Sequence, residues 1–205
     1  MPKPWLKQHR RDYYYRKAKE EKYRSRAAYK LFQIIRKYHF MKPKDIVVDL
    51  GAAPGGWMQI SSKIVGKQGI VLGVDIKEIE PLNDPNTCAI VGDVTDPEII
   101  NQIQEILPRS ADVVISDVSP NLSGVWDLDH ARQIDLARQS LQIALAVLGE
   151  GGNFFVKTFQ GDMLNAFLEE VKQYFKRVEI VKPKASRTKS AEIYILGMSL
   201  KTKLT

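Results

Sequence analysis

The sequence predicts an α/β fold: a doubly wound, mostly parallel sheet of seven strands in which the last strand runs antiparallel. Apolar runs rich in β-branched residues alternate with segments of helical periodicity along the chain. A glycine-rich turn at residues 51–56 follows the first of these runs, as in a strand–turn–helix unit. Residues 182–191 separate the last two strands and are too few for a helical crossover, so these two strands should be antiparallel.

Each element of the first half has its own signal. Apolar residues recur at helical spacing between residues 25 and 40, and Pro43 ends this helix. Gly66 and Gly69 close the helix that follows the glycine-rich turn. The strands expected here are residues 46–50, 70–75 and 87–91, and the further helices are residues 57–65 and 97–107.

The second half repeats the alternation. Residues 119–126 lack periodicity and predict a loop, and Gly151 and Gly152 precede the next strand. The expected strands are residues 112–117, 153–158, 177–181 and 192–200, and the helices are residues 129–148 and 163–175.

Bulk composition fits one soluble domain of residues 24–205 behind a basic extension of residues 1–23. Hydrophobic residues make up 44% of the chain and charged residues 27%. No apolar run is long enough to cross a membrane, and the N-terminus is too basic for a signal peptide, so we expect a cytoplasmic protein. Cys88, the only cysteine, excludes an internal disulfide and a cysteine-cluster metal site, and its apolar strand predicts a small core residue. The three histidines lack metal-ligand spacing, so we expect no metal.

Positive charge gathers at the N-terminal end. Residues 1–42 hold 14 Lys and Arg against 3 Asp and Glu, whereas the whole chain has a net charge of +7. Aromatic residues interleave with these cations, and cations neutralise phosphates while rings stack on bases, so we expect a nucleic-acid partner. The alternative is a solvated tail. The candidate RNA contacts are Arg10, Arg11, Arg16, Lys17, Lys182, Lys184, Arg187 and Lys189.

Polar residues mark the carboxyl ends of the expected strands. The turn 51–56 departs from the dinucleotide-binding Gly-x-Gly-x-x-Gly pattern in its middle glycine, but Asp75 closes the next strand, where an acid can accept the hydroxyls of a ribose. Asp93, Asp117 and Lys157 also lie at or just past strand ends, and Glu192 begins the antiparallel strand at the same edge. Ligands of open α/β sheets bind at this edge.

Three motifs then identify a family. They are residues 49–57 (Asp-Leu-Gly-Ala-Ala-Pro-Gly-Gly-Trp), residues 116–121 (Ser-Asp-Val-Ser-Pro-Asn) and Ser186-Arg187-x-x-Ser190-x-Glu192. With them, residues 24–200 resemble the FtsJ/RrmJ family of RNA ribose 2′-O-methyltransferases, most closely the single-domain members that act on a uridine of large-subunit ribosomal RNA. The antiparallel ending is also typical of S-adenosylmethionine methyltransferases.

The resemblance implies the site residues. The family's catalytic Lys-Asp-Lys-Glu tetrad falls on Lys30, Asp117, Lys157 and Glu192. The residues implied to bind S-adenosylmethionine are Gly51, Gly55, Gly56, Trp57, Asp75, Asp93 and Asp117. The implied partner is RNA, either free ribosomal RNA or the large ribosomal subunit, and we expect a monomer without metal or membrane contacts.

Methyl transfer to a ribose requires a general base or a group that stabilises the oxyanion, because an unassisted hydroxyl is a poor nucleophile near neutral pH. Lys157 is the candidate base; alternatively, a charged Lys157 stabilises the developing alkoxide. The loop after the fourth strand, Asp117-Val118-Ser119-Pro120-Asn121, lacks the Asn/Asp-Pro-Pro-Tyr pattern of enzymes that methylate amines, so we expect an oxygen acceptor.

Several other functions compete with this interpretation. Among methyltransferases the runner-up is a tRNA anticodon-loop ribose methyltransferase, and cap methylation is a third possibility. A nicotinamide-dependent oxidoreductase shares the first strand–helix–strand unit but is disfavoured by the missing middle glycine. A non-catalytic RNA-binding protein on the same fold is disfavoured by the complete tetrad.

Overall fold

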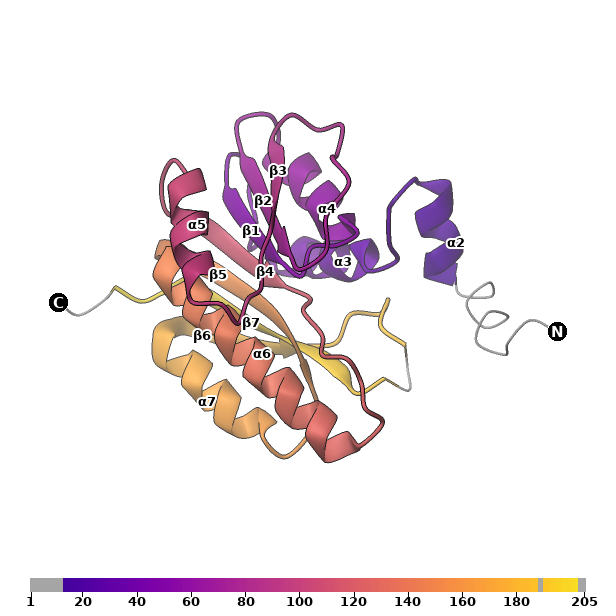
Figure 1. Cartoon of the computed structure of the whole chain (residues 1–205), viewed down its shortest axis with the longest axis vertical. Coiled ribbons are helices and arrows are strands. Elements are labelled where there is room, and N and C mark those ends of the chain that lie inside the picture. Colours follow the sequence, from indigo (N-terminus) through magenta and orange to yellow (C-terminus); the bar gives the residue numbers. More distant parts are fainter. Residues whose placement is uncertain (1–12, 188–189, 203–205) are drawn as a thin grey trace.

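The computed structural model describes residues 13–187 and 190–202. Figure 1 shows a central sheet with helices on both faces, and α2 standing apart beside α3. The strands are β1 Ile46–Leu50, β2 Ile70–Asp75, β3 Thr87–Val91, β4 Ala111–Ser116, β5 Leu148–Phe159, β6 Phe175–Val181 and β7 Glu192–Leu200. The helices are α2 Tyr13–Glu20, α3 Ala28–Tyr38, α4 Gly56–Val65, α5 Glu98–Ile106, α6 Trp126–Val147 and α7 Leu164–Tyr174.

The sheet has the strand order β3-β2-β1-β4-β5-β7-β6. Strands β1 to β5 pair in parallel, and β7 runs antiparallel to both of its neighbours, β5 and β6. The predicted fold class is therefore confirmed, with β7 inserted between β5 and β6. The chain reverses its direction of winding between β1 and β4, and this switch point is where open α/β sheets bind ligands.

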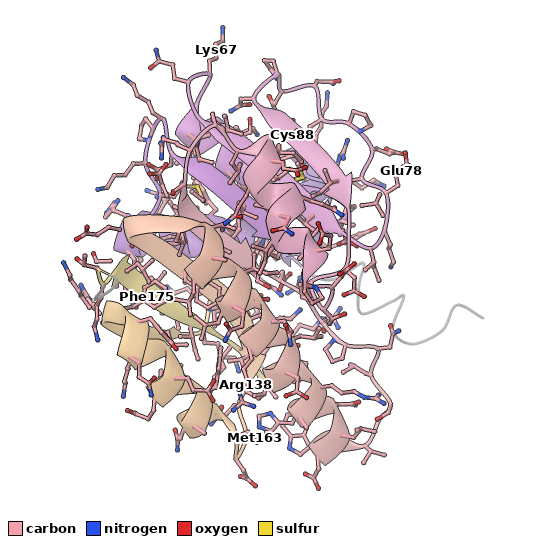
Figure 2. The ribbon with its side chains drawn as sticks, turned by 60° about the vertical axis from the view of Figure 1, so that its left-hand side comes forward. Lys67, Glu78, Cys88, Arg138, Met163 and Phe175 are labelled. Atoms are coloured by element: carbon pink, nitrogen blue, oxygen red, sulfur yellow. The ribbon has the colours of Figure 1, made fainter. Side chains whose placement is uncertain are left out.

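Two apolar layers hold the sheet. One cluster joins its face to α5, α6 and α7, and the other joins the opposite face to α3 and α4. Alternation along β1 explains this, because Val48 and Leu50 belong to the first cluster and Val47 to the second. On the first face, Arg138 of α6 pairs with Glu170 of α7, with 2.6 Å between Nη2 and Oε1; Figure 2 shows Arg138 between these helices.

Several details differ from the sequence-based expectations. Helix α6 begins at Trp126 rather than at residue 129, and β5 begins at Leu148, ahead of the glycine pair. Cys88 is exposed, so its assignment to the core is wrong. The reason is that β3 is the edge strand of the sheet, where neighbouring side chains cover little of its surface.

Among residues 13–187 and 190–202, no helix combines the length and the apolar character that crossing a membrane needs. Over the same ranges, no group of three or more His, Cys, Asp or Glu side chains could hold a metal ion.

Candidate active site

The glycine-rich turn connects β1 to α4 at the switch point. Gly51 and Gly55 have φ values of 73° and 103°, a conformation that side chains disfavour. A Cβ atom on Gly51 would lie 2.8 Å from Cγ2 of Val118, the residue that follows Asp117. The turn therefore packs closely against the loop after β4, and glycine is required there.

Asp49 lies one residue before the end of β1 and is fully buried. No hydrogen-bond donor among the described residues reaches either of its carboxylate oxygens. Burial first, and then the charges of Asp117 and Asp75, raise the pKa of Asp49 well above its ordinary value. Burial of two carboxylate oxygens without hydrogen-bond donors destabilises the folded protein. A cationic ligand group near the glycine-rich turn would offset this loss of stability.

The two acids of the expected adenosine side both accept backbone hydrogen bonds. Asp75 Oδ2 accepts from the amide of Ala53 in the glycine-rich turn at 2.9 Å, and its Oδ1 accepts from the amide of Lys77 at 2.9 Å. Asp93 Oδ1 accepts from the amide and the hydroxyl of Thr95, at 2.9 and 2.8 Å. Both carboxylates are thus held in place at the carboxyl ends of β2 and β3.

Trp57 differs from the other expected cofactor contacts. Its side chain is buried, and its indole N–H donates to the carbonyl of Ala27 at 2.7 Å. The ring centroid lies 5.6 Å from that of Phe155 and 6.0 Å from that of Tyr194. The indole therefore packs between α4 and the sheet. If Trp57 contacts a ligand, it does so through its backbone at the start of α4.

The structure brings the four tetrad side chains together. Lys30 of α3 pairs with Glu192 of β7, with Nζ lying 2.7 Å from Oε1 and 2.8 Å from Oε2. Lys157 of β5 lies 3.3 Å from Oδ1 of Asp117 and donates a 2.6 Å hydrogen bond to the Asp117 carbonyl. Two amines and two carboxylates thus form two ion pairs at one edge of the sheet.

Tyr194 joins the two pairs and was not singled out from the sequence. Its hydroxyl donates to Oδ1 of Asp117 at 3.0 Å and accepts from Nζ of Lys30 at 3.2 Å. Burial first, and then the charges of Asp117 and Glu192, raise the pKa of Tyr194 well above its usual value, so the phenol keeps its proton. The alternation of side chains along a strand could have pointed to Tyr194, because it is two residues after Glu192 and therefore shares its face of β7.

Arg24 connects the segment before α3 to the glycine-rich turn and to the loop after β2. Its guanidinium donates to the carbonyl of Pro54 at 3.1 Å, to that of Pro81 at 2.8 Å, and also to that of Glu80. Its backbone amide donates to Oε1 of Gln59 in α4 at 2.8 Å. One side chain therefore ties the glycine-rich turn to the loop after β2.

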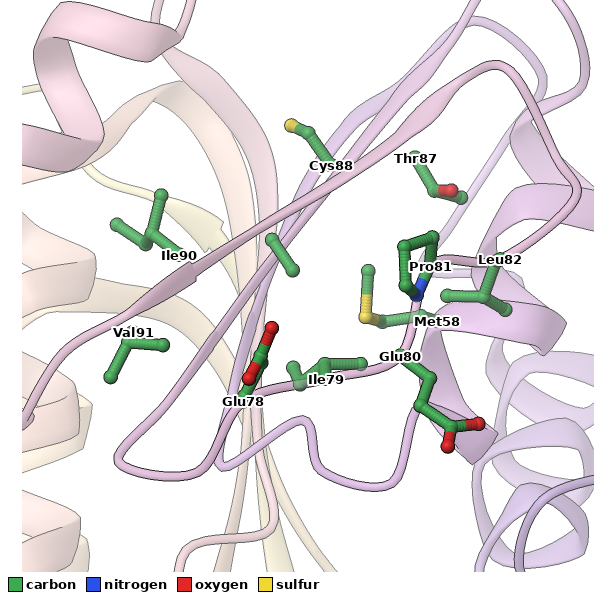
Figure 3. Close-up of a pocket in the computed structure, with 11 residues that line it drawn as sticks. Met58, Glu78, Ile79, Glu80, Pro81, Leu82, Thr87, Cys88, Ile90 and Val91 are labelled. Atoms are coloured by element: carbon green, nitrogen blue, oxygen red, sulfur yellow. The ribbon is translucent and has the colours of Figure 1, made fainter.

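A cavity of about 400 Å³ lies between the loop after β2 and strand β3. It is bounded by Met58 of α4, by residues 78–82 and by residues 87–91 of β3. Figure 3 shows Met58, Ile79 and Pro81 on one side of β3, with Cys88 on the other. None of the tetrad residues lines this cavity, so the acid–base groups lie at the switch point rather than in this hollow.

The expected RNA contacts lie in separate places. Arg10, Arg11 and Lys189 are outside the described residues. Arg16 is exposed on α2, whereas the amine of Lys17 lies 5.2 Å from the ring centroid of Tyr29.

The loop that follows β6 reaches the tetrad. The hydroxyl of Ser186 donates to Oε1 of Glu192 at 2.9 Å, and Lys182, Lys184 and Arg187 are exposed on the same loop. The loop thus contacts the tetrad through Ser186, while its three cations face solvent.

A basic groove extends from this loop along α3. It has a volume of about 400 Å³ and is lined by Lys182 and Lys184 together with Arg36 and Lys37 at the end of α3. Arg36 and Lys37 were not predicted as RNA contacts, because two cations at a helix C-terminus also stabilise the helix itself.

The fold and the site define a class of protein. A seven-stranded sheet of this order, with a glycine-rich turn after β1 and an acidic residue at the end of β2, is typical of α/β enzymes that bind an adenosine-containing cofactor at the switch point. The lysines and carboxylates at the same edge add the acid–base groups that a transfer reaction needs.

Comparison with known proteins gives the family. The model of the FtsJ-like methyltransferase family matches residues 23–200, so the chain belongs to this family and is a methyltransferase. Membership implies S-adenosylmethionine as the methyl donor in general. The oxidoreductase and the non-catalytic alternatives are thereby set aside.

Relatives and a solved structure agree. The chain is 51% identical over 198 residues to ribosomal RNA large subunit methyltransferase E of Methanocaldococcus jannaschii, covering 95% of this chain and 81% of that protein. It is 56% identical over 190 residues to the protein of the same name in Methanothrix thermoacetophila, covering 93% and 73%. A crystal structure named for a ribosomal RNA methyltransferase of Plasmodium falciparum superimposes with a TM-score of 0.77 at 29% identity, covering 87% of this chain and 98% of that one.

Proposed function

We propose that this protein transfers the methyl group of S-adenosylmethionine to the ribose 2′-hydroxyl of a uridine in large-subunit ribosomal RNA. The observation that carries the proposal is the convergence of Lys30, Asp117, Lys157 and Glu192 beside the glycine-rich turn. The names of the relatives support ribosomal RNA as the substrate. We further propose that the protein acts in the cytoplasm as a monomer, on free ribosomal RNA or on the large ribosomal subunit.

The residues present fit S-adenosylmethionine. The carboxylate of Asp75 suits the ribose hydroxyls, and Asp93 suits the adenine side. The glycine-rich turn lets a ligand approach the backbone closely, as the negative methionyl carboxylate at a helix N-terminus requires. The buried carboxylate of Asp49 and the nearby Asp117 suit the methionyl ammonium. When bound, this cofactor supplies an electrophilic methyl carbon.

Two routes take up the proton of the 2′-hydroxyl. If Lys157 is neutral, its amine would accept the proton as the oxygen–methyl bond forms and the sulfur–methyl bond of the cofactor breaks, releasing the thioether. If Lys157 is charged, the proton passes to the carboxylate of Asp117 while the ammonium stabilises the developing oxyanion. A carbonyl oxygen and a carboxylate oxygen both contact Nζ of Lys157, and both favour an ammonium, so the geometry supports the charged form.

Lys30 and Glu192 then act in positioning. Glu192 neutralises Lys30, and Lys30 donates to the phenol of Tyr194, which in turn donates to Asp117. The chain of contacts fixes the orientation of the Asp117 carboxylate relative to Lys157.

We propose that residues 24–205 form the catalytic domain and that residues 1–23 and the loop 182–189 hold RNA phosphates.

Methyl transfer with purified components tests this function. Ribosomal RNA and large subunits from a strain lacking the gene should accept one methyl group, and the modified nucleotide should resist alkaline hydrolysis. Lys157→Ala should abolish transfer while calorimetry shows cofactor binding retained, and Lys172→Ala, at an exposed lysine of α7, should behave as wild type. Methylation of tRNA instead of ribosomal RNA would refute the substrate assignment and favour the anticodon-loop alternative.

The pH dependence of single turnover separates the two proton routes. A neutral Lys157 predicts a rate that rises through neutral pH, because only the deprotonated amine reacts. A charged Lys157 predicts no ascending limb near neutrality. A rising limb that disappears in a Lys157 variant with residual activity would contradict the charged form.

A further inference from the structure

An exposed apolar surface lies next to the tetrad and has no part in the chemistry proposed above. The loop that leaves β4 at Asp117 enters α6 at Trp126, and four large apolar side chains on this stretch are exposed. Their exposed fractions are 66% for Leu122, 59% for Val125, 47% for Trp126 and 42% for Leu128. Such a run on the surface of a water-exposed protein marks a binding site more often than a solvated loop.

Trp126 is held by two rings. Its centroid lies 5.7 Å from that of His130 with the planes 12° apart, and 6.1 Å from that of Phe159 with the planes 26° apart. His130 is itself fixed, because its Nε2 accepts from the amide of Met163 at 3.1 Å. The indole is thus supported from the protein side while nearly half of its surface faces solvent.

The loop in front of Trp126 is ordered by hydrogen bonds. Oδ1 of Asp129 accepts from the amide and the hydroxyl of Ser123, at 2.7 and 2.8 Å, and its Oδ2 accepts from the amide of Gly124 at 3.0 Å. The Ser123 amide, as the largest effect, lowers the pKa of Asp129, so the carboxylate stays ionised and keeps these bonds. The exposed side chains therefore stand on a preformed scaffold.

Strand register fixes this surface relative to the tetrad. Phe159 is the pairing partner of Glu192 between β5 and β7, and it follows Lys157 by two residues, about 7 Å along the strand. Nε2 of Gln133 in α6 donates to the carbonyls of both Val118 and Lys157, at 3.2 and 3.1 Å. Figure 1 shows the start of α6 at the same end of the molecule as the end of β5.

We propose that Trp126, supported by Phe159 and His130, stacks an unpaired base of the RNA substrate within one nucleotide of the methylated ribose. The proposal rests on the RNA substrate proposed above. The surface suits a base rather than a phosphate, because residues 122–128 contain one charged side chain, the acidic Asp127, and no cation. Aromatic faces bind bases of any sequence, so this subsite selects single-stranded over paired RNA rather than one nucleotide over another.

Binding of a fluorescein-labelled oligouridylate to the full chain without cofactor tests the proposal independently of methyl transfer. Trp126→Ala should weaken binding by about 5- to 150-fold, the equivalent of one stacked base. Trp126→Phe should keep most of the affinity because a ring remains. Tyr174→Ala, at an exposed aromatic residue ending α7, is the matched control and should bind as wild type.

A backbone-only probe separates stacking from a change in fold. An oligomer of ribose phosphate without bases should bind wild type and Trp126→Ala equally. In a Trp5→Phe background the remaining indoles are Trp126 and the buried Trp57, so oligouridylate should quench the emission of Trp126.

Each other outcome has a defined meaning. Unchanged oligouridylate affinity in Trp126→Ala, or an equal loss on the oligomer without bases, would overturn the stacking proposal. Wild type that binds oligouridylate through Trp126 but methylates no RNA would overturn the proposed function alone. Absence of oligouridylate binding by wild type would overturn the stacking proposal, whereas methylation of ribosomal RNA by the same preparation would leave the proposed function intact.

Discussion

Tyr194→Phe is the most informative single change, because it removes one hydroxyl from the middle of the tetrad. The ring stays in its stack, where its centroid lies 4.8 Å from that of Phe155 at an interplanar angle of 11°. The variant loses the 3.0 Å bond to Asp117 and the 3.2 Å bond from Lys30. Packing is thus retained while the link between the two ion pairs is lost.

The size of the effect follows from the charge on the partners. A hydrogen bond to a charged group contributes about 1.5–3 kcal/mol. If the whole free energy of the bond to Asp117 stabilises the transition state, its loss slows methyl transfer by about 10- to 150-fold, because 1.36 kcal/mol corresponds to a factor of ten in rate. Cofactor affinity should change little, because the hydroxyl of Tyr194 bonds to Lys30 and Asp117 and not to the glycine-rich turn.

Single-turnover transfer of labelled methyl to saturating ribosomal RNA measures this effect, with calorimetry for the cofactor and thermal unfolding for the fold. Tyr174→Phe, at an exposed tyrosine, is the control and should react at the wild-type rate. A folded Tyr194→Phe protein that reacts at the wild-type rate would refute the positioning role. A loss of cofactor affinity as large as the loss of rate would show instead that Tyr194 positions the cofactor.

Three further predictions concern stability and RNA binding. The raised pKa of Asp49 means that its contribution to stability is full at acid pH, below the ordinary carboxyl pKa, and is lost as the pH rises through the folded-state value; Asp49→Asn should therefore unfold at a higher temperature than wild type at neutral pH, with a difference that shrinks in acid. A pH-independent difference would contradict this. Lys182→Ala combined with Lys184→Ala should reduce the salt slope of single-stranded RNA binding by about 1.4, whereas Lys67→Ala, an exposed lysine after α4 (Figure 2), should not. Phe155→Ala should lower the free energy of unfolding by about 3–5 kcal/mol in denaturant titrations, because a fully buried ring is removed, and a loss below 1 kcal/mol would show that the core closes the gap.

The sequence predicted the parts of the fold that depend on local pattern. The bounds of β1, β2, β3 and β7 coincide with the expected strands, because each is a short apolar run with clear turn residues on both sides. The start of α6 at Trp126 was missed, because the loop before it is held by the carboxylate of Asp129 rather than by turn residues.

Long-range pairing limited what could be predicted of the site. Antiparallel β7 followed from the short connection, but its insertion between β5 and β6 depends on sheet contacts that no local pattern encodes. The same register places Tyr194 opposite Lys157, which is why its role emerged only in the structure. Exposure of Cys88 likewise depends on which strand ends the sheet rather than on the apolar run itself.

Arg24 gives the enzyme a mechanical property that its separate parts do not have. Because one guanidinium bonds to the carbonyls of both Pro54 and Pro81, a shift of the peptide leading into α3 would disturb the glycine-rich turn and the loop after β2 together. Helix α3 also carries Lys30, so the short stretch of residues 24–30 connects a tetrad lysine to the glycine-rich turn and to the loop after β2.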